Sequence, residues 1–183
     1  MAETDQAIID DIVGFWRKAG PDAWFKKDAA FDETFRQTFH NRHFAAARRD
    51  YDHWIETADG ALALMILLDQ FPRNCFRGTG HMYATDSLAR HYAGEALERG
   101  HDLALEPSVR GFLYLPFMHS EDIDEQLRCV KLYTASAPSQ LEWAEDHYNI
   151  IHRFGRFPHR NAILGRKSTP DEQAFLDAGG FAG

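Results

Sequence analysis

The chain has 183 residues, a length typical of one domain, and 44% of them are hydrophobic, which is enough for a packed core. Asp and Glu (28) outnumber Lys and Arg (20), giving a net charge of −8. This acidic excess argues against a nucleic-acid or membrane partner, because a protein surface that binds these polyanions needs net positive charge. The N-terminus lacks a signal-peptide pattern, and no apolar run is long enough to span a bilayer. We therefore expect one cytoplasmic domain, residues 1–183.

The spacing of apolar residues predicts an all-α fold. Ile8, Ile12 and Trp16 recur at four-residue intervals, and Phe31, Phe35 and Phe39 form a second stripe with the same spacing. Val, Ile and Thr together number only 20, so residues that favour strands are scarce. No segment alternates apolar and polar residues over the length of a strand.

Caps and helix breakers divide the chain into seven or eight helices. In the first half we expect helices from a cap at Thr4 to Gly20-Pro21, from a cap at Asp28 through Phe39, from Phe44 to Arg49, and a buried helix over Ala61–Leu68 that ends at Phe71-Pro72. In the second half we expect helices over Met82–Arg99 and from Pro107 to Pro116. A cap at Ser120 predicts a helix over Glu121–Tyr133. Two capping boxes, Ser139–Glu142 and Thr169–Glu172, predict the starts of the last two helices, the first of which ends at Phe154. Short loops between these helices predict antiparallel pairs, in a bundle or a short α-solenoid.

The segment from His152 to Lys167 holds five Arg and Lys residues and no acid, in a chain that is otherwise acidic. Guanidinium groups suit bidentate binding of carboxylate or phosphate. One interpretation is an anion pocket lined by Arg153, Arg156, His159 and Arg160, with Asn161 beside them. The alternative is that these arginines pair with acids of the same chain.

A second candidate segment follows the apolar helix and contains Asp69, Gln70, Arg73 and Asn74. A carboxylate at the end of a helix that is apolar on every side needs a cation or several donors. The natural partner of Asp69 is Arg73 or an arginine of the segment from His152 to Lys167. The segment is therefore either part of a ligand site or a structural ion pair.

A third candidate is His119-Ser120-Glu121, which follows an apolar stretch. His119 and Glu121 could form an acid–base pair, with Ser120 as a helix cap. A metal site that adds His152 or His159 is a weaker alternative, because no H-x-x-x-H or H-E-x-x-H spacing is present. We predict neither a metal nor a cofactor.

One motif occurs twice. Phe71-Pro72-Arg73-Asn74 returns 86 residues later as Phe157-Pro158-His159-Arg160-Asn161, with one inserted histidine. Duplication and chance convergence explain this echo equally well.

These motifs together resemble a known family. Leu67–Asn74, Phe112–Pro116, His119–Glu121, Arg153–Asn161 and Leu164–Thr169 are similar in order and spacing to the signatures of the bacterial domain of unknown function 924 family. The resemblance extends from about Ile8 to Phe181. It implies an all-α fold of the tetratricopeptide-like superhelix type, and it implies no activity and no catalytic residues.

Two functions remain open on this reading. The first is a pocket for a small anionic molecule or phosphate group, formed where the three segments converge, with hydrolase-type chemistry on His119 or His159 and on Asp69 or Glu121. The alternative is a tetratricopeptide-like scaffold that binds a peptide or protein, in which the polar segments only stabilise the fold.

Overall fold

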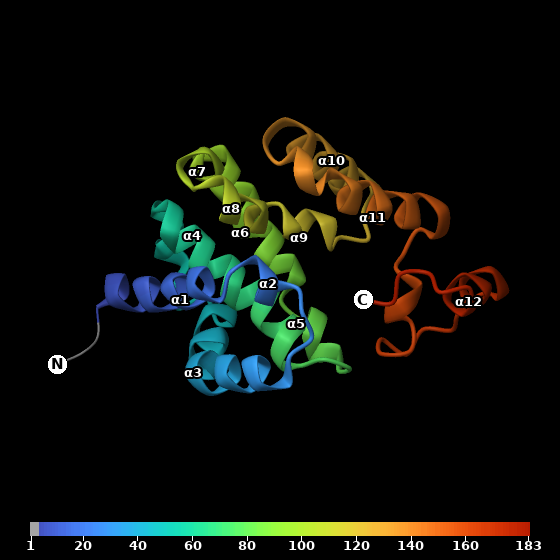
Figure 1. Ribbon diagram of the computed structural model, residues 1–183, viewed down its shortest axis with the longest axis horizontal. Coiled ribbons are helices and arrows are strands. Elements are labelled where there is room, and N and C mark those ends of the chain that lie inside the picture. The colour runs from blue at the N-terminus through green and yellow to red at the C-terminus, as the bar shows by residue number, and fades with distance from the viewer. Residues whose placement is uncertain (1–3) are drawn as a thin grey trace. The chain divides into compact units, whose positions relative to one another are not determined.

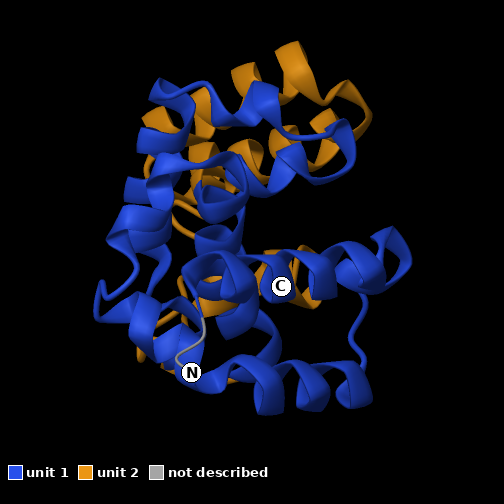
Figure 2. Ribbon diagram, turned by 90° about the vertical axis from the view of Figure 1, so that its left-hand side faces the viewer, with its two compact units in different colours: residues 1–77, 81–116 blue, residues 78–80, 117–183 orange. Residues whose placement is uncertain are grey.

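The computed structural model describes residues 4–183, and within them every regular element is a helix (Figure 1). The predicted all-α class is confirmed. The helices are more numerous than the seven or eight expected, because several are single turns that the periodicity of apolar residues cannot resolve. The chain forms two compact units, which Figure 2 colours separately. Unit 1 runs to Arg77 and resumes from His81 to Pro116, and unit 2 consists of Gly78–Gly80 and Phe117–Gly183.

Unit 1 contains most of the helices. They are α1 (Asp5–Ala19), α2 (Pro21–Trp24), α3 (Ala29–Ala47), α4 (Ala58–Met65), α5 (Phe71–Cys75), α6 (Asp86–Glu98), α7 (His101–Ala104) and α8 (Pro107–Arg110). Unit 1 also has tight 3₁₀ turns at Asp52–Glu56 and Gly111–Leu113 and a π-helical turn at Ile66–Gln70. A further 3₁₀ turn, Gly80–Tyr83, begins in unit 2 and ends in unit 1. The two expected helices in the region of Phe31 to Arg49 are the single helix α3.

An aromatic cluster forms much of the core of unit 1. Trp16 of α1 is fully buried, and its ring centroid lies 5.5 Å from that of Phe35 on α3 and 5.4 Å from that of Phe112. The stripe predicted from Ile8, Ile12 and Trp16 is buried along its whole length. The four-residue spacing of these side chains therefore directs α1 into the core.

The predicted end of the central helix at Phe71-Pro72 is wrong. α4 passes into the π-helical turn, in which the amide of Phe71 bonds to the carbonyl of Ile66, and α5 then runs through Pro72 to Cys75. A proline inside a helix leaves the carbonyl four residues earlier without its usual donor. Here that carbonyl belongs to Leu68, and the hydroxyl of Thr85 donates to it at 2.5 Å. The wider turn and this side-chain donor let the helical path continue past Pro72.

Unit 2 is built around a helical hairpin. Its helices are α10 (Ile123–Ser136), α11 (Leu141–Phe154) and α12 (Pro170–Asp177), with 3₁₀ turns at Pro138–Gln140 and Pro158–Arg160. α10 packs against α11 along its length. Ile150, Ile151 and Phe157 are buried together, and Phe154 and Phe175 pack on them. The short helix α9 (Leu115–Met118) contains the boundary between the units.

Side-chain caps decide where several helices begin. Thr4 caps α1 and Asp28 caps α3 as predicted, and Thr169 forms a complete capping box with Glu172 at α12. Two other caps were predicted wrongly. Asp122, not Ser120, caps α10, because its carboxylate accepts from the amide of Asp124 and shifts the start by two residues. The expected box at Ser139 does not form, because this residue lies inside a 3₁₀ turn that precedes α11.

Gly60 provides a test of how closely α4 packs against the turn that precedes it. A Cβ atom added there would overlap the carbonyl oxygen of Trp54, whereas one added at Gly94 in α6 would meet nothing within 4 Å. We expect Gly60→Ala to lower the free energy of unfolding by about 2 kcal/mol through overpacking. Gly94→Ala should raise it by about 0.5–1 kcal/mol, the usual gain inside a helix. Urea denaturation measures both, and an equal gain at the two positions would contradict the packing of α4.

Candidate functional site

The predicted site residues fall into two clusters, one in each unit. The unit 1 cluster contains Asp69, Gln70, Arg73 and Asn74, and the unit 2 cluster contains His119, Glu121, Arg153, Arg156, His159, Arg160 and Asn161. Each cluster is brought together by the fold of its own unit. The expectation of one shared pocket for both stays a prediction.

In the unit 1 cluster, Arg73 binds two carboxylates. Its Nη1 lies 3.0 Å from Asp69 Oδ1 and 2.8 Å from Asp86 Oδ1, and its Nη2 donates to Asp86 Oδ2 at 3.0 Å. The side chain of Asp69 is 1% exposed and also accepts from Gln70 Nε2 at 2.6 Å. Burial by itself would lower the pKa of Arg73, but the charges of Asp69 and Asp86 outweigh it and raise that pKa above its ordinary value. The guanidinium fork is therefore closed by Asp86.

The same cluster supports the π-helical turn. Three successive carbonyls there accept from side chains: Leu67 from His43 Nδ1 at 2.8 Å, Leu68 from Thr85, and Asp69 from Arg73 at 3.0 Å. His43 is fully buried, and burial lowers its pKa to about 4, so the ring is neutral at physiological pH. π-Helical turns are frequent at functional sites. In this one, side-chain donors replace regular helix bonds and hold the turn in place.

Asn74 has an unusual buried donor. The residue is 6% exposed, and its Nδ2 has no hydrogen-bond acceptor among the described residues. Buried amide donors are nearly always paired, with protein, water or a ligand. This atom is the feature of the unit 1 cluster that best suits a bound acceptor group.

In the unit 2 cluster, Glu121 binds Arg166 and a backbone amide. Arg166 Nη1 lies 2.6 Å from Glu121 Oε2, and Arg166 Nη2 and the amide of Phe157 donate to Oε1 at 2.9 and 2.8 Å. Burial would raise the pKa of Glu121, but these donors outweigh it and lower the pKa. The carboxylate is thus ionised and occupied, which is unfavourable for the predicted role in acid–base exchange with His119.

Glu172 forms a second bidentate pair. Arg156 donates to it through Nε at 2.6 Å and Nη2 at 2.8 Å, and the amide of Thr169 donates at 2.7 Å. Asn161 Nδ2 adds a contact at 3.2 Å. The side chain of Glu172 is 3% exposed, and the Arg156 hydrogen bonds are the largest cause that lowers its pKa to about 2. Arg156, a predicted ligand-binding residue, thereby ties the start of α12 to the end of α11.

His159 and Arg160 lie against aromatic rings. The ring centroid of His159 is 5.5 Å from that of Phe157 and 5.1 Å from that of Phe181, and burial lowers its pKa to about 3. The guanidinium carbon of Arg160 lies 4.6 Å from the Phe157 ring centroid, and its Nη2 donates to the carbonyl of His119 at 2.9 Å. His159 is therefore a neutral imidazole at physiological pH.

Arg153 differs from the other arginines. It is exposed, and its guanidinium carbon lies 4.6 Å from the ring centroid of Phe154 and 5.9 Å from that of Phe175. No carboxylate pairs with it in the described part of the chain. It is the one predicted ligand-binding arginine that keeps its full donor capacity.

Sequence reasoning missed the partners that complete these clusters. Asp86 and His43 stand in segments without a recognisable motif, so no local signal identified them. Glu172 was recognised as a capping residue, and Arg166 as part of the basic segment. The pairing of Glu172 with Arg156, 16 residues away, and of Arg166 with Glu121, 45 residues away, follows only from the fold.

The described residues add two general observations. Within residues 4–183, no group of three or more His, Cys, Asp and Glu side chains is arranged to hold a metal ion. In the same part of the chain, no helix combines the length and apolarity needed to cross a bilayer.

Comparison with known proteins places these clusters in a family context. The profile of a family described as bacterial protein of unknown function (DUF924) matches residues 12–180. A solved structure of a protein of unknown function from Agrobacterium tumefaciens is 57% identical, and the match covers 96% of this chain and 99% of that chain with a TM-score of 0.94. No curated protein matches the chain.

The Glu172 pair predicts how stability depends on pH. Its pKa falls from an ordinary 4.5 to about 2 in the folded chain, so the folded state binds fewer protons than the unfolded state between these values. We expect Glu172→Gln to destabilise the protein by about 2 kcal/mol at neutral pH. This difference from the native chain should shrink as the pH falls from about 4.5 toward 2.

Chemical denaturation of both proteins across this pH range measures the difference. A difference that stays constant down to the lowest pH would show that the charge of Glu172 does not stabilise the fold.

Proposed function

Because the chain belongs to the DUF924 family of bacterial proteins of unknown function, we propose a function from its geometry alone: a non-catalytic helical scaffold that docks a partner peptide. In this proposal the polar motifs stabilise helix ends, and the peptide binds an exposed helix face. The helix pairs would serve as they do in tetratricopeptide-like arrays.

The observation that carries the proposal is the pairing of Arg73, Arg156 and Arg166. Each guanidinium presents two donors to one carboxylate, at distances between 2.6 and 3.0 Å. A bidentate pair uses the geometry with which arginine would otherwise grip a phosphate or carboxylate ligand. An incoming anion would have to displace a buried or half-buried carboxylate, which leaves that carboxylate unpaired.

The candidate acids and bases also support a non-catalytic role. A general acid or base works best with a pKa near the working pH. His159 has a pKa of about 3, and the pKa of Glu121 is lowered. Neither group would exchange a proton readily near neutrality.

The first turns of α11 present a face that suits a partner. Trp143 is 61% exposed, and tryptophan is enriched among the residues that dominate binding energy at protein interfaces. Glu142, Glu145 and Asp146 are exposed on the same helix. An aromatic anchor next to acidic groups favours a peptide that pairs an apolar residue with a basic one.

A small-anion site is the second candidate, and Arg153 favours it. This guanidinium is exposed and has no carboxylate partner among the described residues. Flanked by the half-buried rings of Phe154 and Phe175, it could receive a phosphate or carboxylate group.

Two titrations separate the candidates. For a scaffold, we expect millimolar phosphate to leave the melting temperature no higher than an equal ionic strength of chloride does. For an anion site, saturating phosphate should raise it by roughly 5–10 °C, because ligand at a hundredfold excess over Kd contributes about 2.7 kcal/mol. A rise in melting temperature that Arg153→Ala abolishes would support the anion site and contradict the scaffold.

The peptide itself is tested with an array of short peptides that vary in charge and aromatic content. We expect peptides with a basic residue beside an apolar one to bind, and Trp143→Ala to weaken them by about tenfold or more, consistent with an interface hot spot. Arg153→Ala is the matched control on the same helix and should leave binding unchanged. Binding that is indifferent to Trp143 would contradict the proposed docking face.

A further inference from the structure

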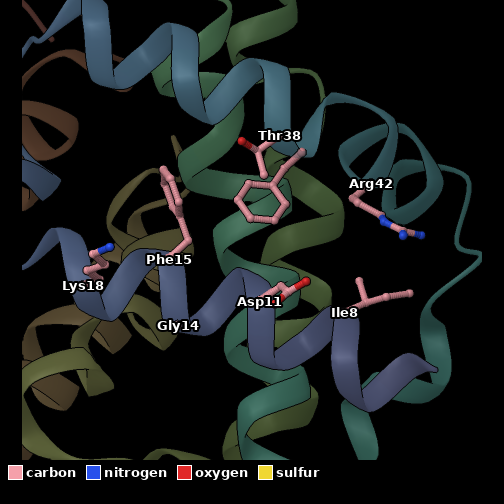
Figure 3. Close-up of a pocket in the computed structure, with 8 residues that line it drawn as sticks. Ile8, Asp11, Gly14, Phe15, Lys18, Thr38 and Arg42 are labelled. Atoms are coloured by element: carbon pink, nitrogen blue, oxygen red, sulfur yellow. The ribbon is translucent and has the colours of Figure 1, made fainter. Parts of the chain in front are cut away.

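A cleft lies between α1 and α3 in unit 1, and none of the residues of the polar motifs lines it (Figure 3). Its volume is about 470 Å³, within the range of roughly 300–1,000 Å³ that is usual for small-molecule sites. The residues that line it are Ile8, Asp11, Gly14, Phe15, Lys18, Thr38, Phe39 and Arg42.

The floor of the cleft is apolar and aromatic. The rings of Phe15 and Phe39 meet edge to face with centroids 5.3 Å apart, and Ile8 extends the same surface. Phe39 is buried and Phe15 is half-buried, so part of the Phe15 ring faces the opening. Figure 3 shows the Phe15 side chain rising from α1 toward α3, the helix that carries Thr38.

Gly14 leaves the α1 wall of the cleft open. It lies inside a helix, where glycine is less favourable than alanine by about 0.5–1 kcal/mol. A Cβ atom added at Gly14 would meet nothing within 4 Å, so packing within the described chain does not require glycine here. A glycine at such a wall lets another molecule approach the helix backbone closely.

The charged groups of the cleft are placed along its rim. Lys18 follows Phe15 by three residues and so lies beside it on the same helix face. Within the described residues, Lys18 has no ion-pair partner. Arg42 donates to the hydroxyl of Tyr51 at 3.1 Å, and Asp11 supplies the one acidic side chain of the lining. The lining thus carries two cations and one anion.

We propose that this cleft binds a small amphipathic organic anion. Its apolar body would pack on Phe15 and Phe39 next to Gly14, and its carboxylate or sulfonate would pair with Lys18. The proposal is independent of the peptide face on α11, because the two surfaces share no residue.

The test uses anilinonaphthalene sulfonate, an amphipathic anion that fluoresces in apolar sites, and its neutral relative phenylnaphthylamine. We expect the native protein to bind the sulfonate saturably and dodecanoate to displace it. Gly14→Leu should weaken binding by about tenfold or more, because the new side chain projects into the cleft while leucine remains a good helix former. Gly94→Leu on α6 is the matched control, since Gly94 is also an open position inside a helix, and it should bind like the native protein.

Lys18→Gln tests the charge. It should lower the affinity for the sulfonate several-fold and leave the affinity for the neutral probe unchanged. Equal losses of affinity for both probes would overturn the anion preference. Near-UV circular dichroism establishes that each variant is folded.

Three further outcomes would overturn the proposal. One is sulfonate binding that Gly14→Leu does not weaken. Another is a change in molar mass caused by Gly14→Leu in sedimentation equilibrium, which would make a second copy of the chain the occupant. The third is displacement of the probe by an amphipathic helical peptide but not by dodecanoate, which would make a partner helix the occupant.

Discussion

A buried ionised side chain is stable only when it is paired with an opposite charge and its hydrogen bonds are satisfied, and the polar motifs of this protein follow from that constraint. Asp69 and Glu172 are almost fully buried, and each has an arginine within 3.0 Å. The pairs stand where regular α-helix is interrupted: Arg73 next to the π-helical turn, and Arg156 between α11 and α12. Such pairs fix geometry more than they add stability, because desolvation offsets much of the attraction.

The repeated Phe-Pro motif shows the same constraint once in each unit. Phe71 and Phe157 are fully buried, and the arginine that follows each of them donates to a backbone carbonyl, Arg73 to Asp69 and Arg160 to His119. The phenylalanine anchors the motif in the core, and the arginine bonds a backbone carbonyl, which lies four residues earlier for Arg73 and in a distant segment for Arg160. The two copies differ in their other partners, and only the second follows the end of an α-helix, so the likeness lies in the buried phenylalanine and the arginine that donates to a carbonyl.

Much of the fold could be predicted from the sequence because helix periodicity and caps are local signals. The stripe of Ile8, Ile12 and Trp16 and the cap at Thr169 are clear in the chain itself. The path through Pro72 was not predictable, since it depends on a hydroxyl from Thr85 that only the folded chain brings near. For the same reason, the motifs identified Arg73 and Arg156 but not the carboxylates with which they pair in the fold, Asp86 and Glu172.

The central claim is that these arginines act on the fold through their carboxylate partners, and a double-mutant cycle on Arg73 and Asp86 tests it most directly. The cycle compares Arg73→Met, Asp86→Asn and the double variant by chemical denaturation. The account predicts a coupling free energy of about 1.5–3 kcal/mol, the upper part of the range for contacting residues, with the double variant more stable than the sum of the single losses implies. A coupling near zero, with additive losses, would show that the pair does not act as a unit and would contradict the account.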